Sequence, residues 1–290
     1  MTQHGLIYLY LVLLCAFIGC KDKPEEQQEP EPDTPEEPAV ANTAADKALL
    51  DKVQEATFRY FWDYAHPVSG MARERTGSGD LVTSGGSGFG VQALVVGVER
   101  GWITRQQAVE RLHKMTDFLA KADRFHGAWP HWLNGNTGAV IPFSAKDNGG
   151  DLVETSFLIN GLLVARAYFN GSDAQETELR NKITILLEAV EWDWYASRGD
   201  GLLYWHWSPV FGWEMNMPIR GWNEALITHI LALASPTHAI EPEVYQRTWV
   251  NRKTGTYEGY MLEMGPGYGG PLFFAHYSFL SLDPRQMEDQ

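Results

Sequence analysis

Three acidic residues stand where apolar helices are expected to begin. Asp151 and Glu154 lie three residues apart, so on a helix their side chains share one face. Glu224 ends the segment Ile219-Arg-Gly-Trp-Asn-Glu224. Hydrolysis of a glycosidic bond needs one carboxyl group to protonate the leaving oxygen and a second to activate water or attack the anomeric carbon. We therefore interpret Asp151, Glu154 and Glu224 as candidate catalytic acids.

The same three acids also have a structural interpretation. Asp-x-x-Glu is the pattern of a capping box, in which Asp151 caps the helix and Glu154 reaches back to the helix start. An acid such as Glu224 gains from the helix dipole wherever a helix begins. The spacing alone does not separate the catalytic from the structural interpretation.

Aromatic residues are frequent near these acids. The chain has 11 tryptophans, and many of them stand in connections such as Gly127-Ala-Trp-Pro-His-Trp132. Flat aromatic faces suit stacking on pyranose rings, although some large aromatics simply fill the core. We therefore expect a sugar to be bound by aromatic and imidazole side chains of these connections: Trp222, Trp129, His131 and Trp132.

Four times a glycine-rich loop runs into a helix that is apolar on nearly every side. These loop-helix units begin at Thr83, Asn148, Ile219 and Gly267. Each such helix is preceded by one with a charged face. A helix that is apolar all round must be buried, whereas one with a single apolar stripe lies at the surface. This alternation predicts two concentric rings, an all-α (α/α)6 toroid whose inner helices start, with their carboxylates, at one end.

The apolar periodicity gives the expected helices. The outer ones are 46–64, 104–123, 174–192 and 242–250, and the inner ones are 88–99, 151–169, 223–234 and 271–281. A closed ring of this kind needs twelve helices, so only about eight of twelve are expected here, in a domain truncated at its C-terminus. A smaller, open helical array is the alternative. Short strands are expected only in the long connections, notably at 202–207.

The first 43 residues resemble export and tether sequences. An apolar run in residues 1–20 ends in Gly19-Cys20, which indicates a lipoprotein signal peptide with Cys20 as the lipidated residue; simple secretion is the alternative. Residues 21–43 are rich in Pro and Glu, which predicts a disordered acidic tether. The remainder, 44–290, is expected to form one helical domain. We therefore expect a cell-envelope lipoprotein that meets the membrane only through its lipid.

The charge and the cysteine content exclude several functions. The formal net charge is −14, and the domain has no basic run, which argues against nucleic acid as a partner. The two cysteines, Cys15 and Cys20, both fall in the signal region, and the histidines form no HExxH pattern. No Walker loop is present. We therefore expect neither a metal nor a cofactor.

Several stretches resemble one protein family. From about residue 55 onward they follow one another in the order and with the spacing of the glucoamylase-like domain family, which includes the endo-β-1,2-glucanases of glycoside hydrolase family 144. The resemblance implies an (α/α)6 toroid, an inverting hydrolase and a β-1,2-linked glucan substrate. The stretches are Ser87–Gly90, Gly97–Thr104, Asp151–Ser156, Gly161–Arg166, Gly221–Ala225, Leu233–His238 and Gly270–Ser278.

The resemblance also assigns roles. The essential acids of the family correspond by motif to Asp151, Glu154 and Glu224; we interpret Glu224 as the general acid and the other two as sugar-binding residues or parts of the proton relay. Arg75 and His276 complete the candidate substrate-binding residues. Family members continue past the last stretch with further helices that we expect to carry another acid. The general base is therefore unassigned, and a position beyond Gln290 is open to it.

Two other functions stay open at this point. One is a non-catalytic glycan-binding surface lipoprotein, and the other is an exo-acting α-glucosidase of the glucoamylase type, because fold does not fix function. Release of reducing ends from β-1,2-glucan, measured beside affinity on the same protein, separates hydrolysis from binding alone. Endo or exo action, linkage and chain-length preference are not determined by these patterns.

Overall fold

A computed structural model describes residues 43–249, 254–262, 265 and 269–287. The chain divides into two units, Met1–Ala45 and Asp46–Gln290. The helices and strands belong to the second unit, apart from the first two residues of the first helix. The expected signal peptide with Cys20 lies outside the described residues, as does the expected tether up to residue 42.

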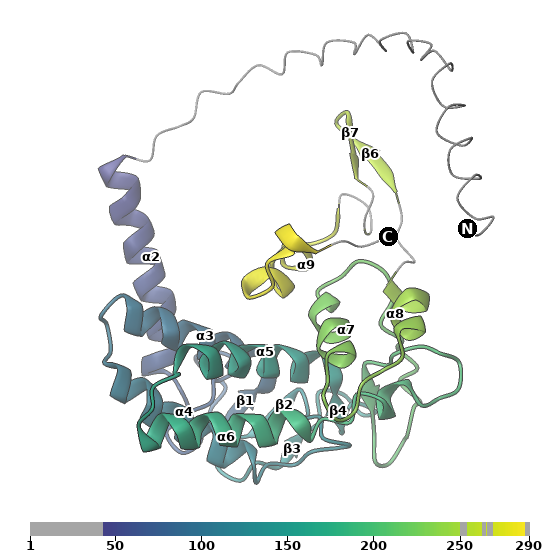
Figure 1. Cartoon of the computed structure of the whole chain (residues 1–290), viewed down its shortest axis with the longest axis horizontal. Coiled ribbons are helices and arrows are strands. Elements are labelled where there is room, and N and C mark those ends of the chain that lie inside the picture. The colour runs from purple at the N-terminus through teal and green to yellow at the C-terminus, as the bar shows by residue number, and fades with distance from the viewer. Residues whose placement is uncertain (1–42, 250–253, 263–264, 266–268, 288–290) are drawn as a thin grey trace, which may run out of the picture. The chain divides into compact units, whose positions relative to one another are not determined.

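Eight α-helices follow one another in the part of the chain that the structure describes (Figure 1). They fall where the sequence predicts helices, with shifted ends. Their bounds are α2 Ala44–Asp63, α3 Ser84–Glu99, α4 Arg105–Leu119, α5 Leu152–Tyr168, α6 Ala174–Glu188, α7 Leu226–Leu233, α8 Pro242–Trp249 and α9 Phe273–His276.

Seven short strands form three small antiparallel sheets among the described residues. The order β1-β2-β3 makes one sheet, β4 pairs with β5, and β6 pairs with β7. The expected strand at 202–207 is confirmed at its end. The bounds are β1 Leu81–Thr83, β2 Trp132–Asn134, β3 Val140–Ile141, β4 Gly150–Asp151, β5 His206–Trp207, β6 Gly255–Tyr257 and β7 Tyr260–Leu262.

Helices α3 and α5 are two of the inner helices, and two glycines let them pack closely. A Cβ atom on Gly88 of α3 would lie 2.1 Å from the carbonyl oxygen of Phe157, and one on Gly161 of α5 would lie 2.2 Å from the carbonyl oxygen of Gly88. No side chain fits at either position. The two backbones therefore approach each other directly, and buried residues line α5 on nearly every side.

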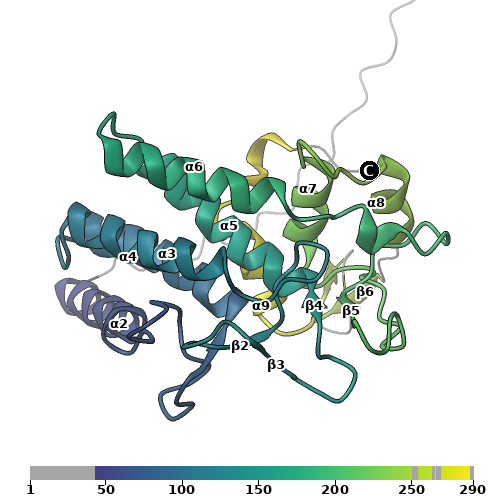
Figure 2. The ribbon, with the colours of Figure 1, turned by 90° about the horizontal axis from the view of Figure 1, so that it is seen from below.

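Helices α4 and α6 are the outer helices, and they lie side by side (Figure 2). In α4 the buried residues recur every three or four positions, as on a surface helix: Ala108, Val109, Leu112, Met115, Thr116 and Leu119. Thr104 and Gln107 form a complete capping box that starts this helix. The alternation of inner and outer helices read from the sequence is thus confirmed for α3 to α6.

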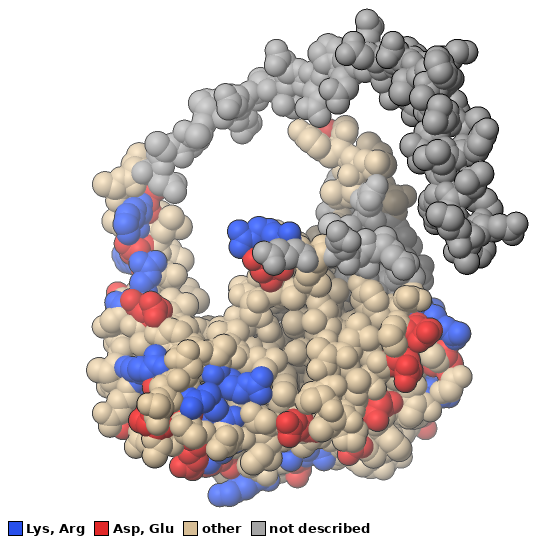
Figure 3. Space-filling view, in the orientation of Figure 1, with Lys and Arg blue, Asp and Glu red and all other residues tan. Residues whose placement is uncertain are grey.

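The first and last helices differ from the prediction. The expected apolar stripe of α2 is covered only toward its end, where Phe58 is buried, whereas Leu49 and Leu50 are about 60% exposed. The expected inner helix 271–281 is instead the single turn α9 followed by a 3-10 turn, Ser278–Leu280, and Leu272 before it is exposed. On the face drawn in Figure 3, uncharged residues cover most of the surface and charges of both signs are interspersed.

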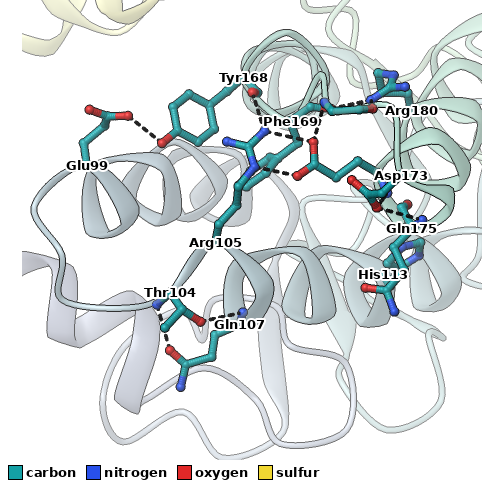
Figure 4. A network of polar contacts seen from close by, with 12 residues as sticks. Glu99, Thr104, Arg105, Gln107, His113, Tyr168, Phe169, Asp173, Gln175 and Arg180 are labelled. Atoms are coloured by element: carbon teal, nitrogen blue, oxygen red, sulfur yellow. Dashed lines mark hydrogen bonds and ion pairs between the residues drawn. The ribbon is translucent and has the colours of Figure 1, made fainter.

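A network of polar contacts joins the ends of α3 and α5 to the starts of α4 and α6 (Figure 4). Arg105 donates two hydrogen bonds to Glu176, at 2.5 and 2.8 Å, and a third to the carbonyl oxygen of Tyr168. The Glu176 carboxylate also accepts from the backbone of Gly171 at 2.6 Å. Because these groups belong to the ends of the inner helices, the network closes the side of the fold away from their starts.

Candidate active site

The starts of α3, α5 and α7 meet. The backbone N–H of Gly85, in the first turn of α3, donates to the Glu154 carboxylate of α5 at 3.1 Å. The hydroxyls of Ser156 in α5 and Thr228 in α7 lie 2.7 Å apart. We call this end of the inner helices the mouth. The expectation that the inner helices begin at one end is met by these three.

Asp151 caps α5, but it does not form a capping box with Glu154. One carboxylate oxygen of Asp151, Oδ1, accepts from the backbone N–H of Glu154 at 2.9 Å. The N–H of Asp151 itself donates to the carbonyl oxygen of Trp129, and the Glu154 carboxylate turns to Gly85 instead. A Cβ on Gly85 would lie only 2.1 Å from that carboxylate, so any larger residue there would displace the Glu154 side chain. The capping interpretation therefore explains the position of Oδ1 of Asp151. It does not explain the position of Oδ2 or of the Glu154 carboxylate.

The other oxygen of Asp151 lies among histidines. Asp151 in β4 pairs with His206 in β5, so the strand register places their side chains together. Oδ2 of Asp151 lies 3.4 Å from Nε2 of His206 and 3.4 Å from Nδ1 of His131. Nε2 of His206 lies 3.3 Å from Oδ2 of Asp147. We call these four residues, Asp147, His206, Asp151 and His131, the buried chain.

Neighbouring charges shift the pKa values of the residues in the buried chain. Burial alone would raise the pKa of Asp151, but the adjacent His131 and the charge of His206 hold it well below its usual range. Burial would lower the pKa of His131, but Asp151 and the nearby Glu154 raise it to about 9. The pKa of His206 is also raised, against burial, by Asp151 and Asp147. Burial raises the pKa of Asp147 against the charges of His206 and His131, and the charge of Asp151 adds to this shift.

The pKa values of the other two acids, Glu154 and Glu224, are raised above their ordinary value. Burial raises the pKa of Glu154 to about 7; the charge of His131 opposes the shift, and the charges of Asp151 and Glu224 add to it. Burial and the charge of Asp151 also raise the pKa of Glu224, although its own backbone N–H opposes the shift. Neighbouring carboxyl groups whose pKa values are pushed apart in this way are typical of acid–base sites.

Glu224 stands just outside a helix. It lies in the turn two residues before α7, so it does not open the helix as the sequence suggested. Its carbonyl oxygen accepts from the hydroxyl of Ser278, which in turn accepts from the N–H of Ile227. The ring of Tyr277 packs on Phe89, and the charges of Glu154 and Glu224 raise the pKa of its hydroxyl together with burial, the larger cause. The segment around Ser278 therefore holds Glu224 at the mouth.

A cation would find one grouping of donors. Among the described residues, atoms of Asp147, Asp151 and His206 lie within 4.8 Å of one another. Nε2 of His206 already lies at ion-pairing distance from both carboxylates, so the protonated ring occupies the place that a cation would take. We therefore interpret this group as a network of ion pairs.

The predicted sugar-binding residues have different surroundings. Trp129 is wholly buried and donates its indole N–H to the carbonyl oxygen of Leu119, so the prediction that it stacks on a sugar is wrong. His131 and Trp132 both pack against Phe143, whose ring is 49% exposed.

The remaining candidates lie on other segments. Trp222 stacks on Phe279 at the segment that holds Glu224. Arg75 is exposed and pairs with its neighbour Glu74, and His276 is exposed on α9. Among the described residues, neither Arg75 nor His276 makes a hydrogen bond or ion pair with the three acids, so their roles stay predictions.

Four residues at the site were not predicted: Asp147, His206, Phe143 and Tyr277. A signal existed for His206, because it stands in the aromatic segment 202–207 that was expected to be a strand. The pairing of that strand with residues 150 and 151 could not be read from either segment alone. Asp147 lies in a polar loop, and its role depends on the position of His206.

An α/α helical fold with acids gathered where its inner helices begin defines a class, the glucoamylase-like proteins. The family described as "Putative glucoamylase" matches residues 216–290. The chain is 46% identical, over 276 residues, to an exo-β-1,2-glucooligosaccharide sophorohydrolase (non-reducing end) of Parabacteroides distasonis, covering 87% of this chain and 38% of the relative. Over the residues that align, the chain is similar to the glucoamylase-like family.

Solved structures agree in fold. The endo-β-1,2-glucanase of Chitinophaga pinensis, solved with sophorotriose and glucose, is 52% identical with a TM-score of 0.80, over 84% of this chain and 62% of that one. A β-1,2-glucanase of Parabacteroides distasonis is 47% identical with a TM-score of 0.81, over 84% and 39% of the two chains. The chain thus spans less than two thirds of the length of these relatives. The predicted helical toroid class is confirmed over the part that it covers.

Proposed function

We propose that this protein is a glycoside hydrolase that cleaves β-1,2-linked glucan with inversion at the anomeric carbon. The observation that carries the proposal is the meeting of Asp151, Glu154 and Glu224 at the mouth, where the charges of Asp151 and Glu224 raise the pKa of Glu154 and the charge of Asp151 raises that of Glu224. The names of the relatives, which are β-1,2-glucanases and a sophorohydrolase, supply the substrate class.

Glu224 is the general acid in this proposal. It is only partly buried, so it can reach a substrate, and its raised pKa favours the protonated form that a general acid needs. Glu154 is more deeply enclosed and is fixed by Gly85, which suits a group that hands on a proton or orients a sugar hydroxyl. Asp151 stays ionised beneath them. Phe143 and Trp132 offer aromatic surface beside the acids for a pyranose ring.

Glu224→Gln tests the assignment. The substitution keeps the size of the side chain and removes only the transferable proton, so we expect turnover of a β-1,2-gluco-oligosaccharide to fall by about 10² to 10⁴ with affinity nearly unchanged. Glu110→Gln, on the exposed face of α4, is the matched control. Wild-type turnover in Glu224→Gln would contradict the assignment. A wild-type protein that binds the oligosaccharide and releases no reducing ends would favour the glycan-binding function instead.

We also propose that Cys20 carries a lipid and anchors the protein in the cell envelope. The support is the sequence pattern before Cys20 and the acidic segment behind it. No helix of the described residues is long and apolar enough to cross a bilayer.

A further inference from the structure

The buried chain alternates acid and base. Asp147, His206, Asp151 and His131 follow one another at separations of 3.3, 3.4 and 3.4 Å. At most 8% of the side chain of any of the first three is exposed, whereas His131 is 26% exposed at the end nearer Phe143. His206 and Asp147 therefore lie behind Asp151, away from where a substrate can reach.

His206 is fixed by its surroundings. Its strand is paired with β4, its ring stacks on Trp205, and its Nε2 faces Asp147 and Asp151 together. The charged groups that act on it are Asp151 of β4, Asp147 of the preceding loop, and His131, whose positive charge opposes that of His206. Oδ2 of Asp151 meets hydrogen-bond geometry with no described residue, so charge holds the Asp151–His206 pair more than direction does.

Removing the positive charge of His206 would leave two carboxylates close together in a buried place. Unpaired buried charges are costly, and one of two neighbouring carboxylates then takes up a proton. Asp147, whose pKa burial already raises, takes up that proton first, and Asp151 loses the charge of His206 that lowers its own pKa. When Asp151 in turn becomes neutral, Glu154 loses the negative neighbour that helps it to keep its own proton. Loss of the positive charge of His206 therefore lowers the pKa of Glu154 by way of Asp151.

We propose that His206 is a positioning residue for the hydrolysis: seated by Asp147, it holds the Asp151 carboxylate ionised and in place, and through Asp151 it keeps Glu154 protonated. The effect on catalysis rests on the proposed function. The protonation of His206 does not, and it can be measured without substrate.

The kinetic test compares His206→Gln with wild type across pH. Gln retains a donor near the position of Nε2 but has no charge. We expect kcat to fall tenfold or more with KM little changed, the acidic limb of the pH profile to rise by about one unit or more, and the alkaline limb to fall. His66→Gln is the matched control, because His66 is equally buried and lies 3.1 Å from Asp80 outside this site. The His66→Gln variant should be less stable than wild type and should have an unchanged pH profile.

A second substitution separates charge from packing. In the double variant Asp147→Asn/His206→Gln, the first substitution removes the unpaired negative charge behind Asp151. We therefore expect the acidic limb of its pH profile to move back toward that of wild type. A merely structural role of His206 predicts that the double variant is no better than His206→Gln. Failure of the double variant to recover, or an unshifted profile in a folded His206→Gln protein, would overturn the proposal.

Two measurements keep the inference independent of the hydrolysis. In the NMR titration of the imidazole signals we expect the pKa of His206 to lie above the ordinary imidazole value of 6.5, and to be lower in Asp147→Asn than in wild type. A His206 that is neutral at pH 6.5 overturns the proposal whether or not the protein hydrolyses glucan. Dialysis against EDTA should leave activity intact; loss of activity that a divalent cation restores would replace the imidazolium with a metal.

Discussion

Glu154 makes the stability of the folded protein depend on pH. Its folded pKa of about 7 lies above the ordinary value of 4.5, so the folded state retains a proton that the unfolded chain releases. This contribution is fully present below about pH 4.5 and is lost as the pH rises through 7. A shift of this size corresponds to about 3 kcal/mol in the free energy of unfolding.

We therefore expect Glu154→Gln to gain stability relative to wild type as the pH rises from 4.5 to 8, because the amide can accept from Gly85 without a buried charge. Denaturant unfolding of both proteins at several pH values measures the difference. Glu110→Gln on the surface of α4 should show no such trend. A difference that does not change with pH would mean that Glu154 ionises as an exposed acid does.

At the residue scale, the sequence predicted the acids but not what surrounds them. Asp151, Glu154 and Glu224 were recognisable because each precedes or begins an apolar helix. His206 was not, because its contact with Asp151 depends on strand pairing across more than 50 residues. Trp129 was misassigned for a related reason: a tryptophan in a loop sequence can point into the core, and only packing decides which way.

At the element scale, the contact between α3 and α5 depends on glycine. Gly161→Ala should lower the free energy of unfolding by about 1 to 3 kcal/mol or more, since the new methyl group would meet the backbone of Gly88. Helix propensity alone predicts that Gly161→Ala raises the free energy of unfolding by about 1 kcal/mol, so the two effects differ in sign. Thermal unfolding decides between them. Gly77→Ala, where nothing lies within 4 Å, is the control and should be nearly neutral.

The helices that the sequence predicted well are those whose apolar faces are covered by neighbouring helices in the structure. Helices α3 to α6 each pack on neighbours, so their apolar faces match what the periodicity indicates. The stripe of α2 and the segment 271–281 follow the same periodicity, yet Leu49, Leu50 and Leu272 are exposed. Periodicity indicates which face could be buried, but it does not supply the neighbour that buries it.

At the scale of the whole molecule, attachment to the envelope depends on Cys20. Cys20→Ser should shift the protein from the membrane fraction to the soluble envelope fraction or block its maturation, because acyl chains anchor by burying CH₂ groups at about 0.8 kcal/mol each. Cell fractionation followed by immunoblotting measures this. Cys15→Ser, within the same apolar run, is the control. Unchanged membrane association of the Cys20→Ser protein would count against lipidation.

The polar network at the ends of α3 and α5 has a consequence for engineering. Arg105 and Glu176 tie the helices together on the side away from the acids, so this network and the proposed sugar-binding mouth are on different segments. Natural enzymes often lose activity when they are made more rigid, because the stabilised region is also the working region. Here a designer could add ion pairs or shorten loops around Arg105 and Glu176 and leave the mouth free to adapt to its ligand.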